Sequence, residues 1–224
     1  MDFYNEIKQL TTLEIGAYTV AVVVSYLLGS LPSGYLAGKA RGVDLRTVGS
    51  GNIGATNAFR ALGKTAGFCV LLVDGFKGFA AAWWVPELVA GLFPSAPPEK
   101  EHLALAAGVA AILGHNYTCW LGFKGGKGIA TSAGVVMAWV PLACLTALAL
   151  WVVLFLATRF VSVASLGAAV ILPLAVWFYN GTLTMTCVMS ALSALAIYKH
   201  KANIRRLMQG TEPRVGAKHK ESPP

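Results

Sequence analysis

The feature that most limits how this chain can fold is a series of long apolar runs. About twenty apolar residues in helical form cross the hydrocarbon core of a bilayer, whereas buried strands rarely exceed about eight residues. Only 12% of the residues are charged, against about 25% in soluble domains. We therefore expect an all-α, polytopic integral membrane protein, and we exclude disorder, a coiled coil and a secreted disulfide scaffold. The runs lie at about residues 15–38, 66–93, 103–122, 129–157, 161–179 and 182–198.

The charges between the runs indicate which side of the membrane each connection faces, because cytoplasmic connections are rich in Lys and Arg. Segment 39–64 has Asp44 as its single acid, and segment 199–220 has Glu212. The N-terminus and the connection at 87–101 are acidic by contrast. We therefore predict an N-terminus outside and a C-terminus in the cytoplasm. The basic residues behind this prediction are Lys39, Arg41, Arg46, Arg60 and Lys64, then Lys199, Lys201, Arg205, Arg206, Arg214, Lys218 and Lys220.

Termini on opposite sides require an odd number of crossings, whereas there are six runs. Run 129–157 would form a helix of about 43 Å, longer than the ~30 Å hydrocarbon core, and Pro141 lies near its middle. Splitting this run gives seven transmembrane helices, which we predict. One long tilted helix with the C-terminus outside is the alternative. We expect a single transmembrane domain over residues 1–224, with a flexible tail after about residue 213.

The segment GSGNIGATNAFRALG, residues 49–63, has the composition of a phosphate-binding loop. Its glycines leave successive N–H groups free to converge on an anion, and it contains no carboxylate. A helix starting near Thr56 adds the positive end of its dipole, with Arg60 one turn further on. Dinucleotide binding is excluded because a membrane span follows, and a flexible glycine-rich turn is the alternative. The candidate binding residues are Gly49, Ser50, Gly51, Asn52, Gly54, Thr56, Asn57 and Arg60.

Two further basic segments lie in predicted connections. FKGGKGIAT, residues 123–131, places Lys124 and Lys127 where the chain turns at the membrane surface, which suits a second anion or a pair of topological anchors. HKANIRR, residues 200–206, follows the last run. If it is helical, His200, Asn203 and Arg206 share a face. Attraction to lipid headgroups explains its cations but does not explain His and Asn together.

Two polar sites lie within apolar runs. Asp74 and Lys77 are three residues apart, so a helix lets them neutralise each other. An unpaired charge at that depth costs about 2.5–3.5 kcal/mol on insertion scales. His115 ends the third run. These residues can support the loops as well as contact substrate. The chain offers no metal-ligand cluster, so we expect no metal and no cofactor.

The three segments, in this order, resemble the bacterial membrane acyltransferases that use an acyl-phosphate to acylate glycerol 3-phosphate. The resemblance covers about Ser25 to Glu212 and rests on GSGNIGATN with Arg60, on FKGGKG, and on H-x-x-N-I-x-R-L-x-x-G-x-E. It implies seven spans, with all three motifs on the cytoplasmic face of the bacterial inner membrane. It marks Glu212 as a possible supporting residue. The polar site that it implies comprises Ser50, Asn52, Thr56, Arg60, Lys127, His200 and Asn203.

The implied reaction is the first step of phosphatidic acid synthesis. It moves a fatty acyl group to the 1-hydroxyl of glycerol 3-phosphate and yields lysophosphatidic acid and inorganic phosphate. The H-x-x-x-x-D pattern of thioester-using acyltransferases is absent from the sequence, which favours acyl-phosphate as the donor. We expect glycerol 3-phosphate, acyl-phosphate and membrane lipids as partners, and no nucleic acid. The alternative function is a small carrier or channel for phosphorylated anions.

We expect direct transfer without an acyl-enzyme, because neither a Ser-His-acid set nor a nucleophilic Cys is apparent. The proton of the attacking hydroxyl goes either to His200 or to a phosphate oxygen of the substrate. We expect His200 mainly to orient the glycerol, with Asn203 beside it. The catalytic candidates are His200, Asn203, Ser50, Arg60 and Lys127.

Overall fold

The computed structural model describes residues 2–94 and 99–216, and every regular element in these residues is a helix. This confirms the all-α prediction. The described residues form two compact units that divide at the start of α7, after Pro141. Unit 1 contains α1 (Asp2–Ser30), α2 (Ser33–Lys39), α3 (Ala55–Leu62), α4 (Lys64–Leu92), α5 (Lys100–Asn116), the 3-10 turn η1 (Cys119–Leu121) and α6 (Ile129–Trp139). Unit 2 contains α7 (Pro141–Thr158), α8 (Val161–Asn180), α9 (Leu183–Lys199) and α10 (Lys201–Met208).

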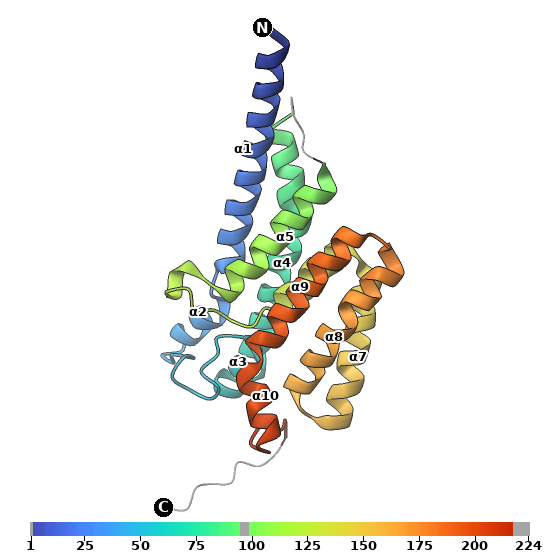
Figure 1. The fold of residues 1–224 in the computed structure, drawn as a ribbon. Coiled ribbons are helices and arrows are strands. Elements are labelled where there is room, and N and C mark those ends of the chain that lie inside the picture. Colours follow the sequence, from blue (N-terminus) through green and yellow to red (C-terminus); the bar gives the residue numbers. More distant parts are fainter. Residues whose placement is uncertain (1, 95–98, 217–224) are drawn as a thin grey trace, which may run out of the picture. The chain divides into compact units, whose positions relative to one another are not determined.

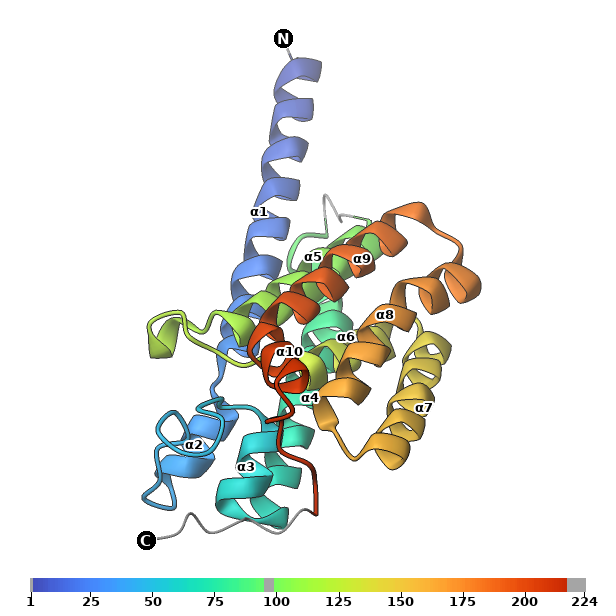
Figure 2. The ribbon, with the colours of Figure 1, turned by 60° about the horizontal axis from the view of Figure 1, so that its bottom comes forward.

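In unit 1, α1, α4 and α5 lie side by side (Figure 1), and the contacts show that α6 packs on α4. The short helices α2 and α3 lie at the end of α1 away from the N-terminus, as both views show (Figure 2). The chain breaks between α1 and α2 at Pro32, whose ring supplies no N–H for a continuous helix. The glycine-rich residues 49–54 lie in the connection between α2 and α3, and residues 122–128 connect η1 to α6.

Glycines let the helices of unit 1 approach closely. Gly29 of α1 lies against the carbonyl of Ala111 in α5, so that a Cβ there would overlap the carbonyl oxygen. Gly78 of α4 lies against the carbonyl of Thr131 in α6 in the same way. Helices in lipid gain little hydrophobic energy by associating, and small residues at the interface allow the van der Waals contact that holds them together.

The apolar run 129–157 is divided into two helices, as predicted. Helix α6 ends at Trp139 and α7 begins at Pro141, with Val140 in a non-helical conformation between them. The alternative of one continuous helix is wrong for this run. Helix α6 has 11 residues, about 17 Å, which is less than the thickness of the hydrocarbon core.

Four segments of the described chain are long and apolar enough to cross a membrane: Thr11–Lys39, Lys64–Leu92, Pro141–Thr158 and Val161–Asn180. Ile129–Trp139 and Leu183–Lys199 are shorter apolar helices. The number of crossings and the sides on which the termini lie remain predictions, as does the single domain. The part of the predicted flexible tail at 217–224 lies outside the described residues.

In unit 2, α8 packs against α9, and α10 continues beyond the end of α9 (Figure 1). The indole Nε1 of Trp151 in α7 donates to the Ser165 hydroxyl in α8, 3.2 Å away. Helix α7 presents large apolar side chains outwards, with Val153 61% and Leu156 70% exposed. An apolar outer face of this kind suits contact with lipid rather than water.

The glycine contact between α4 and α6 predicts the effect of one methyl group. Gly78→Ala must push α6 away from α4, and we expect a loss of about 1–3 kcal/mol of stability from overpacking. The control is Gly91→Ala in the same helix, where nothing lies within 4 Å of the added carbon. Thermal unfolding of the purified protein in detergent measures both. A midpoint that Gly78→Ala leaves unchanged would show that the close approach does not stabilise this pair.

Candidate active site

The first loop, residues 40–54, joins α2 to α3 and contains the motif GSGN. Gly49 and Gly51 have positive φ angles of 60° and 68°, in the left-handed region that favours glycine. A side chain at Gly49 would also overlap Oδ1 of Asn57. The backbone of the motif therefore turns in a way that only glycine permits at these two positions.

Asn57 holds the first loop in shape from within. It is 1% exposed, and its Nδ2 donates to the carbonyls of Leu45 and Val48, each at 3.0 Å. Its Oδ1 accepts from the backbone N–H of Ser50, 3.0 Å away. Both ends of the Asn57 amide thus bond to the backbone of the first loop, so this side chain stabilises the shape of the loop. Direct contact of this side chain with substrate stays a prediction.

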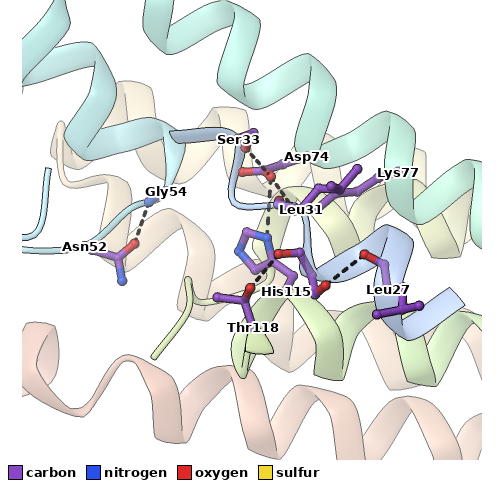
Figure 3. Close-up of polar contacts among 10 residues, drawn as sticks. Leu27, Leu31, Ser33, Asn52, Gly54, Asp74, Lys77, His115 and Thr118 are labelled. Carbon is purple, nitrogen blue, oxygen red and sulfur yellow. Dashed lines mark hydrogen bonds and ion pairs between the residues drawn. The ribbon is translucent and has the colours of Figure 1, made fainter. Parts of the chain in front are cut away.

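The first loop ends at the N-terminus of α3. Asn52 accepts a hydrogen bond from the backbone N–H of Gly54 at 2.8 Å, just before α3 begins at Ala55 (Figure 3). The helix predicted to start near Thr56 is therefore present. Ser50 is exposed before the helix, Thr56 is half-buried in its first turn, and Arg60 is exposed one turn on. This end of α3 carries the partial positive charge of a helix N-terminus.

The second loop, residues 122–128, is held by the end of α5. The carbonyl of His115 accepts the N–H of Gly126 at 3.0 Å, and the carbonyl of Asn116 accepts that of Gly125 at 3.2 Å. The imidazole of His115 lies against Gly126, so that a Cβ there would overlap the ring. Lys127 is half-buried directly after these glycines, whereas Lys124 is exposed before them.

A buried polar cluster lies beneath both loops. The Asp74 cluster consists of Leu31, Ser33, Asp74, Lys77 and His115 (Figure 3). Oδ1 of Asp74 accepts from the Ser33 hydroxyl at 2.7 Å and lies 2.8 Å from Nζ of Lys77 and 3.5 Å from Nδ1 of His115. Nζ of Lys77 also donates to the carbonyl of Leu31 at 2.8 Å. The pairing of Asp74 with Lys77 is thus confirmed, and the two side chains are each 3% exposed.

Further bonds tie the chain after α5 to the end of α1. The Thr118 hydroxyl donates to the carbonyl of Ser30 at 2.6 Å (Figure 3), and Nε1 of Trp120 donates to the Ser30 hydroxyl at 2.9 Å. The Tyr26 hydroxyl donates to the carbonyl of Tyr117 at 2.7 Å. Sequence analysis did not single out Ser33 or Thr118. Isolated hydroxyl residues near a proline or a helix end give no signal of a distant partner.

The third basic segment lies in unit 2. His200 is 3% exposed at the start of α10, and its Nδ1 lies 2.7 Å from the carbonyl of Ala196. A carbonyl can only accept, so Nδ1 carries the hydrogen, and Nε2 of a neutral ring has an acceptor lone pair. This tautomer is the one that can accept a hydrogen bond from a hydroxyl group.

The carboxylate of Glu212 lies against α10 and holds two side chains of that helix. Oε1 accepts from Nδ2 of Asn203 and Oε2 accepts from Nε of Arg206, each at 2.7 Å. Asn203 and Arg206 therefore share a face, as expected for a helical segment. Because Glu212 takes the amide NH₂ of Asn203, the amide oxygen is oriented away from the carboxylate. The sequence indicated Glu212 only as a possible supporting residue, and the structure shows that its carboxylate holds the side chains of Asn203 and Arg206.

The structure brings Asp74, Lys77 and His115 together in unit 1, and it places His200, Asn203 and Glu212 in unit 2. Ser50, Asn52, Thr56 and Arg60 lie along the first loop and α3, while Lys124 and Lys127 lie in the second loop. Convergence of all three segments on one pocket stays a prediction.

Solved structures with this fold include crystal structures of PlsY (YgiH), an integral membrane glycerol 3-phosphate acyltransferase. The glycerol 3-phosphate form matches with a TM-score of 0.79 and 40% identity, over 89% of this chain and 96% of that chain. The lysophosphatidic acid form matches with a TM-score of 0.77 and 38% identity, over 89% and 95% of the two chains. The present fold is therefore that of an integral membrane protein.

The sequence comparisons agree with the fold. Residues 19–210 match the family described as glycerol-3-phosphate acyltransferase. The glycerol-3-phosphate acyltransferase of Geobacter sulfurreducens is 44% identical over 198 residues, 88% of this chain and 97% of the relative. That of Geotalea daltonii is 44% identical over 199 residues, 86% and 95% of the two chains. The chain belongs to the glycerol-3-phosphate acyltransferase family, and the resemblance carried by the three motifs is confirmed.

The surroundings of Glu212 predict a pH dependence. Burial raises the pKa of Glu212, but the hydrogen bonds from Asn203 and Arg206 outweigh it and hold the pKa below its usual 4.5. A carboxylate whose pKa is lower in the folded state stabilises the fold above the unfolded pKa, and this stability is lost as the pH falls through the folded pKa. We expect the melting temperature of the native chain to fall below about pH 4.5. The Glu212→Gln variant should be less stable at pH 7 and should converge with the native chain in acid. A constant difference between them from pH 7 to pH 3 would contradict this assignment.

Proposed function

We propose that the chain transfers a fatty acyl group from an acyl-phosphate to the 1-hydroxyl of glycerol 3-phosphate. The observation that carries the proposal is the match over 89% of the chain, at 40% identity, to an acyltransferase solved in its glycerol 3-phosphate form. A second matching structure is in a lysophosphatidic acid form, which fits the product of this reaction. The acyl-phosphate donor is supported by the absence of an H-x-x-x-x-D pattern and by the two basic glycine loops.

The electrostatics of the reaction explain why two such loops are needed. The two substrates carry up to two negative charges each, and two dianions about 6 Å apart repel by about 3 kcal/mol even at the dielectric constant of water. Backbone N–H groups of the first loop, the N-terminus of α3, Arg60 and Lys127 offset this repulsion in the proposed site. Ser50 and Thr56 add hydroxyl donors for the phosphate that the first loop binds.

The side chains of α10 suit the glycerol end of the substrate. Nε2 of His200 and the amide oxygen of Asn203 are both acceptors, since their neighbouring donor groups bind Ala196 and Glu212. Two acceptors can orient the hydroxyls of glycerol, whereas a phosphate needs donors. We therefore assign His200 and Asn203 to positioning of the glycerol and assign the phosphates to the loops.

The chemical step is direct attack. The 1-hydroxyl oxygen of glycerol 3-phosphate attacks the acyl carbonyl carbon, a new ester bond forms, and the bond from the acyl carbon to the phosphate oxygen breaks. The phosphate leaves with that electron pair, and the hydroxyl proton passes to a phosphate oxygen whose second pKa is near 6. Loop N–H groups stabilise the oxyanion, and holding the two substrates together supplies the proximity effect.

The proposed topology has seven crossings, with the N-terminus outside and the C-terminus in the cytoplasm. It rests on the basic residues of segments 39–64 and 199–220 and on the helix break at Val140. Helix α6 is short for a span, so we infer local thinning of the bilayer at this helix. All three motifs then face the cytoplasm of a bacterial inner membrane, where phosphorylated substrates are dissolved.

Product formation tests the proposed function. Purified protein in phosphatidylcholine nanodiscs, given palmitoyl-phosphate and radiolabelled glycerol 3-phosphate, should form lysophosphatidic acid and inorganic phosphate in equal amounts. We expect full activity in EDTA, and palmitoyl-CoA should be a poor donor. If sealed vesicles that contain the protein accumulate the labelled ester without forming product, the proposed function is wrong and the protein is a carrier for phosphorylated anions.

The role of His200 predicts a bounded loss of rate. If His200 positions the glycerol and does not take the proton, His200→Ala should lower kcat/KM by less than about 10⁴-fold. The control is Arg205→Gln in the same helix, an exposed residue whose loss should leave the rate near that of the native chain. A larger loss in His200→Ala would make the ring an essential base. Mass spectrometry of the protein with palmitoyl-phosphate alone should find no acylated chain, and a covalent adduct would refute direct transfer.

A further inference from the structure

The Asp74 carboxylate joins three different helices at one buried point. It belongs to α4, accepts a hydrogen bond from Ser33 at the start of α2, and lies 3.5 Å from His115 at the end of α5 (Figure 3). Lys77 balances its charge one helical turn away. The side chains of Asp74 and Lys77 are each 3% exposed and that of His115 is 6% exposed, so direct contact with a dissolved substrate is small.

A chain of contacts, here called an arm, runs from the Asp74 cluster to each loop. The first arm leads to the first loop. Ser33 is followed by Gly34, which is buried against the backbone carbonyl of Ile53, and a Cβ on Gly34 would overlap that oxygen. Ile53 lies in the motif GSGNIG, three residues after Ser50. A shift of the first turn of α2 must therefore move the backbone of the motif, because no space separates the two.

Lys77 holds the same arm from a second direction. Its ammonium group donates to the carbonyl of Leu31 at 2.8 Å, in the break between α1 and α2. Pro32 leaves that carbonyl outside a regular helix. Asp74 and Lys77 thus fix the two sides of Pro32, so that the direction in which α2 leaves α1 is set from α4.

The other arm leads to the second loop. His115 contacts Asp74 through Nδ1, while its ring packs on Gly126 and its carbonyl accepts the Gly126 N–H at 3.0 Å. Lys127 is the next residue. The imidazole therefore has Asp74 on one side and Gly126 on the other, so the ring links the carboxylate to the second loop.

We propose that Asp74 is a positioning residue that fixes the first loop and the second loop relative to each other. Through Ser33 and Gly34 it sets the motif that contains Ser50, and through His115 it sets Lys127. This role rests on the proposed function, in which the loops hold the phosphates of the two substrates. The acyl carbon and the attacking hydroxyl must meet at about 3–3.5 Å, and a displacement of about 1 Å can cost a hundred-fold in rate. A shared anchor keeps the distance between the two phosphates constant.

The pairing with Lys77 explains how an acid can serve beneath two anion-binding loops. An unpaired carboxylate would repel the phosphates and would be costly inside a membrane span. With Lys77 at 2.8 Å, the pair is neutral overall and adds no net charge to the loops. The cluster therefore supplies geometry without weakening the positive field of the site.

Steady-state kinetics with both substrates test the proposal. The first variant is Asp74→Leu combined with Lys77→Met, which removes both charges and so leaves no unpaired charge in the span. Ser33→Ala and His115→Ala each break one arm. Because KM does not depend on how much of the enzyme is folded, it separates positioning from a loss of protein. We expect KM to rise about ten-fold in each single variant, for one substrate in Ser33→Ala and for the other in His115→Ala. The paired variant should raise both values and lower kcat/KM about a hundred-fold.

The combined variants give the sharper result. If Asp74 is the common anchor, adding Ser33→Ala or His115→Ala to the paired variant should cause little further loss, because the arm is already broken. The control is Val89→Ala, a fully buried position in α4 that packs with Ala17, Val85 and Leu103 and should lower stability without changing either KM. If the loss of kcat/KM in a combined variant equals the product of the losses in its parts, Asp74 is not the shared anchor. Native KM values in Ser33→Ala and His115→Ala would also overturn the proposal.

The native enzyme distinguishes the two proposals. Absence of lysophosphatidic acid from the native reaction would refute the proposed function. Product from the native chain together with unchanged KM values in all variants would refute the positioning role and leave the function standing. If the paired variant does not fold, Ser33→Ala decides the first arm, since it removes one hydroxyl from a half-buried position.

Discussion

The structure depends on the absence of hydrogen-bonding partners in the hydrocarbon core of a membrane. Every polar group at that depth must be bonded within the protein, so the apolar runs become helices. Glycines such as Gly29 and Gly78 then let these helices approach until backbone meets backbone. Asp74 is buried in a span-length helix because Lys77, Ser33 and His115 surround it. Its polar contacts link α4 to the break between α1 and α2 and to the end of α5.

Polar side chains near the motifs divide into those that shape the backbone and those that the proposed reaction uses. Asn57, Asn52 and Glu212 make their bonds to loops or neighbouring side chains. In the proposed site, Arg60, Lys127 and the hydroxyls of Ser50 and Thr56 contact the phosphates. A glycine-rich loop binds an anion well only when its N–H groups are already oriented, because ordering the loop at the moment of binding would cost conformational entropy. The shaping residues supply that order in advance.

Much of the fold was predictable because a bilayer imposes a length on apolar segments. Helix α4 (Lys64–Leu92) and helix α8 (Val161–Asn180) agree with the predicted runs within a few residues, and the break near Pro141 follows from helix length and proline chemistry. The contacts at the end of α5 were less predictable. The helix stops at Asn116, beside the expected end at His115, but the bonds of Thr118 and Trp120 to Ser30 of α1 were not expected. A contact between residues about ninety positions apart leaves no periodic pattern in the sequence.

Sequence alone was enough to assign the helical membrane class, the basic segments and the three motifs that place the chain in its family. These follow from local composition, since hydrophobic length, charge bias and glycine spacing are properties of short segments. The packing of the helices had to be known to see that Asn57 ties the first loop to itself, that Ser33 joins the Asp74 cluster, and that Nδ1 of His200 faces a carbonyl. Hydrogen bonds are short and directional, so the partner of a buried polar group depends on which distant backbone is packed beside it.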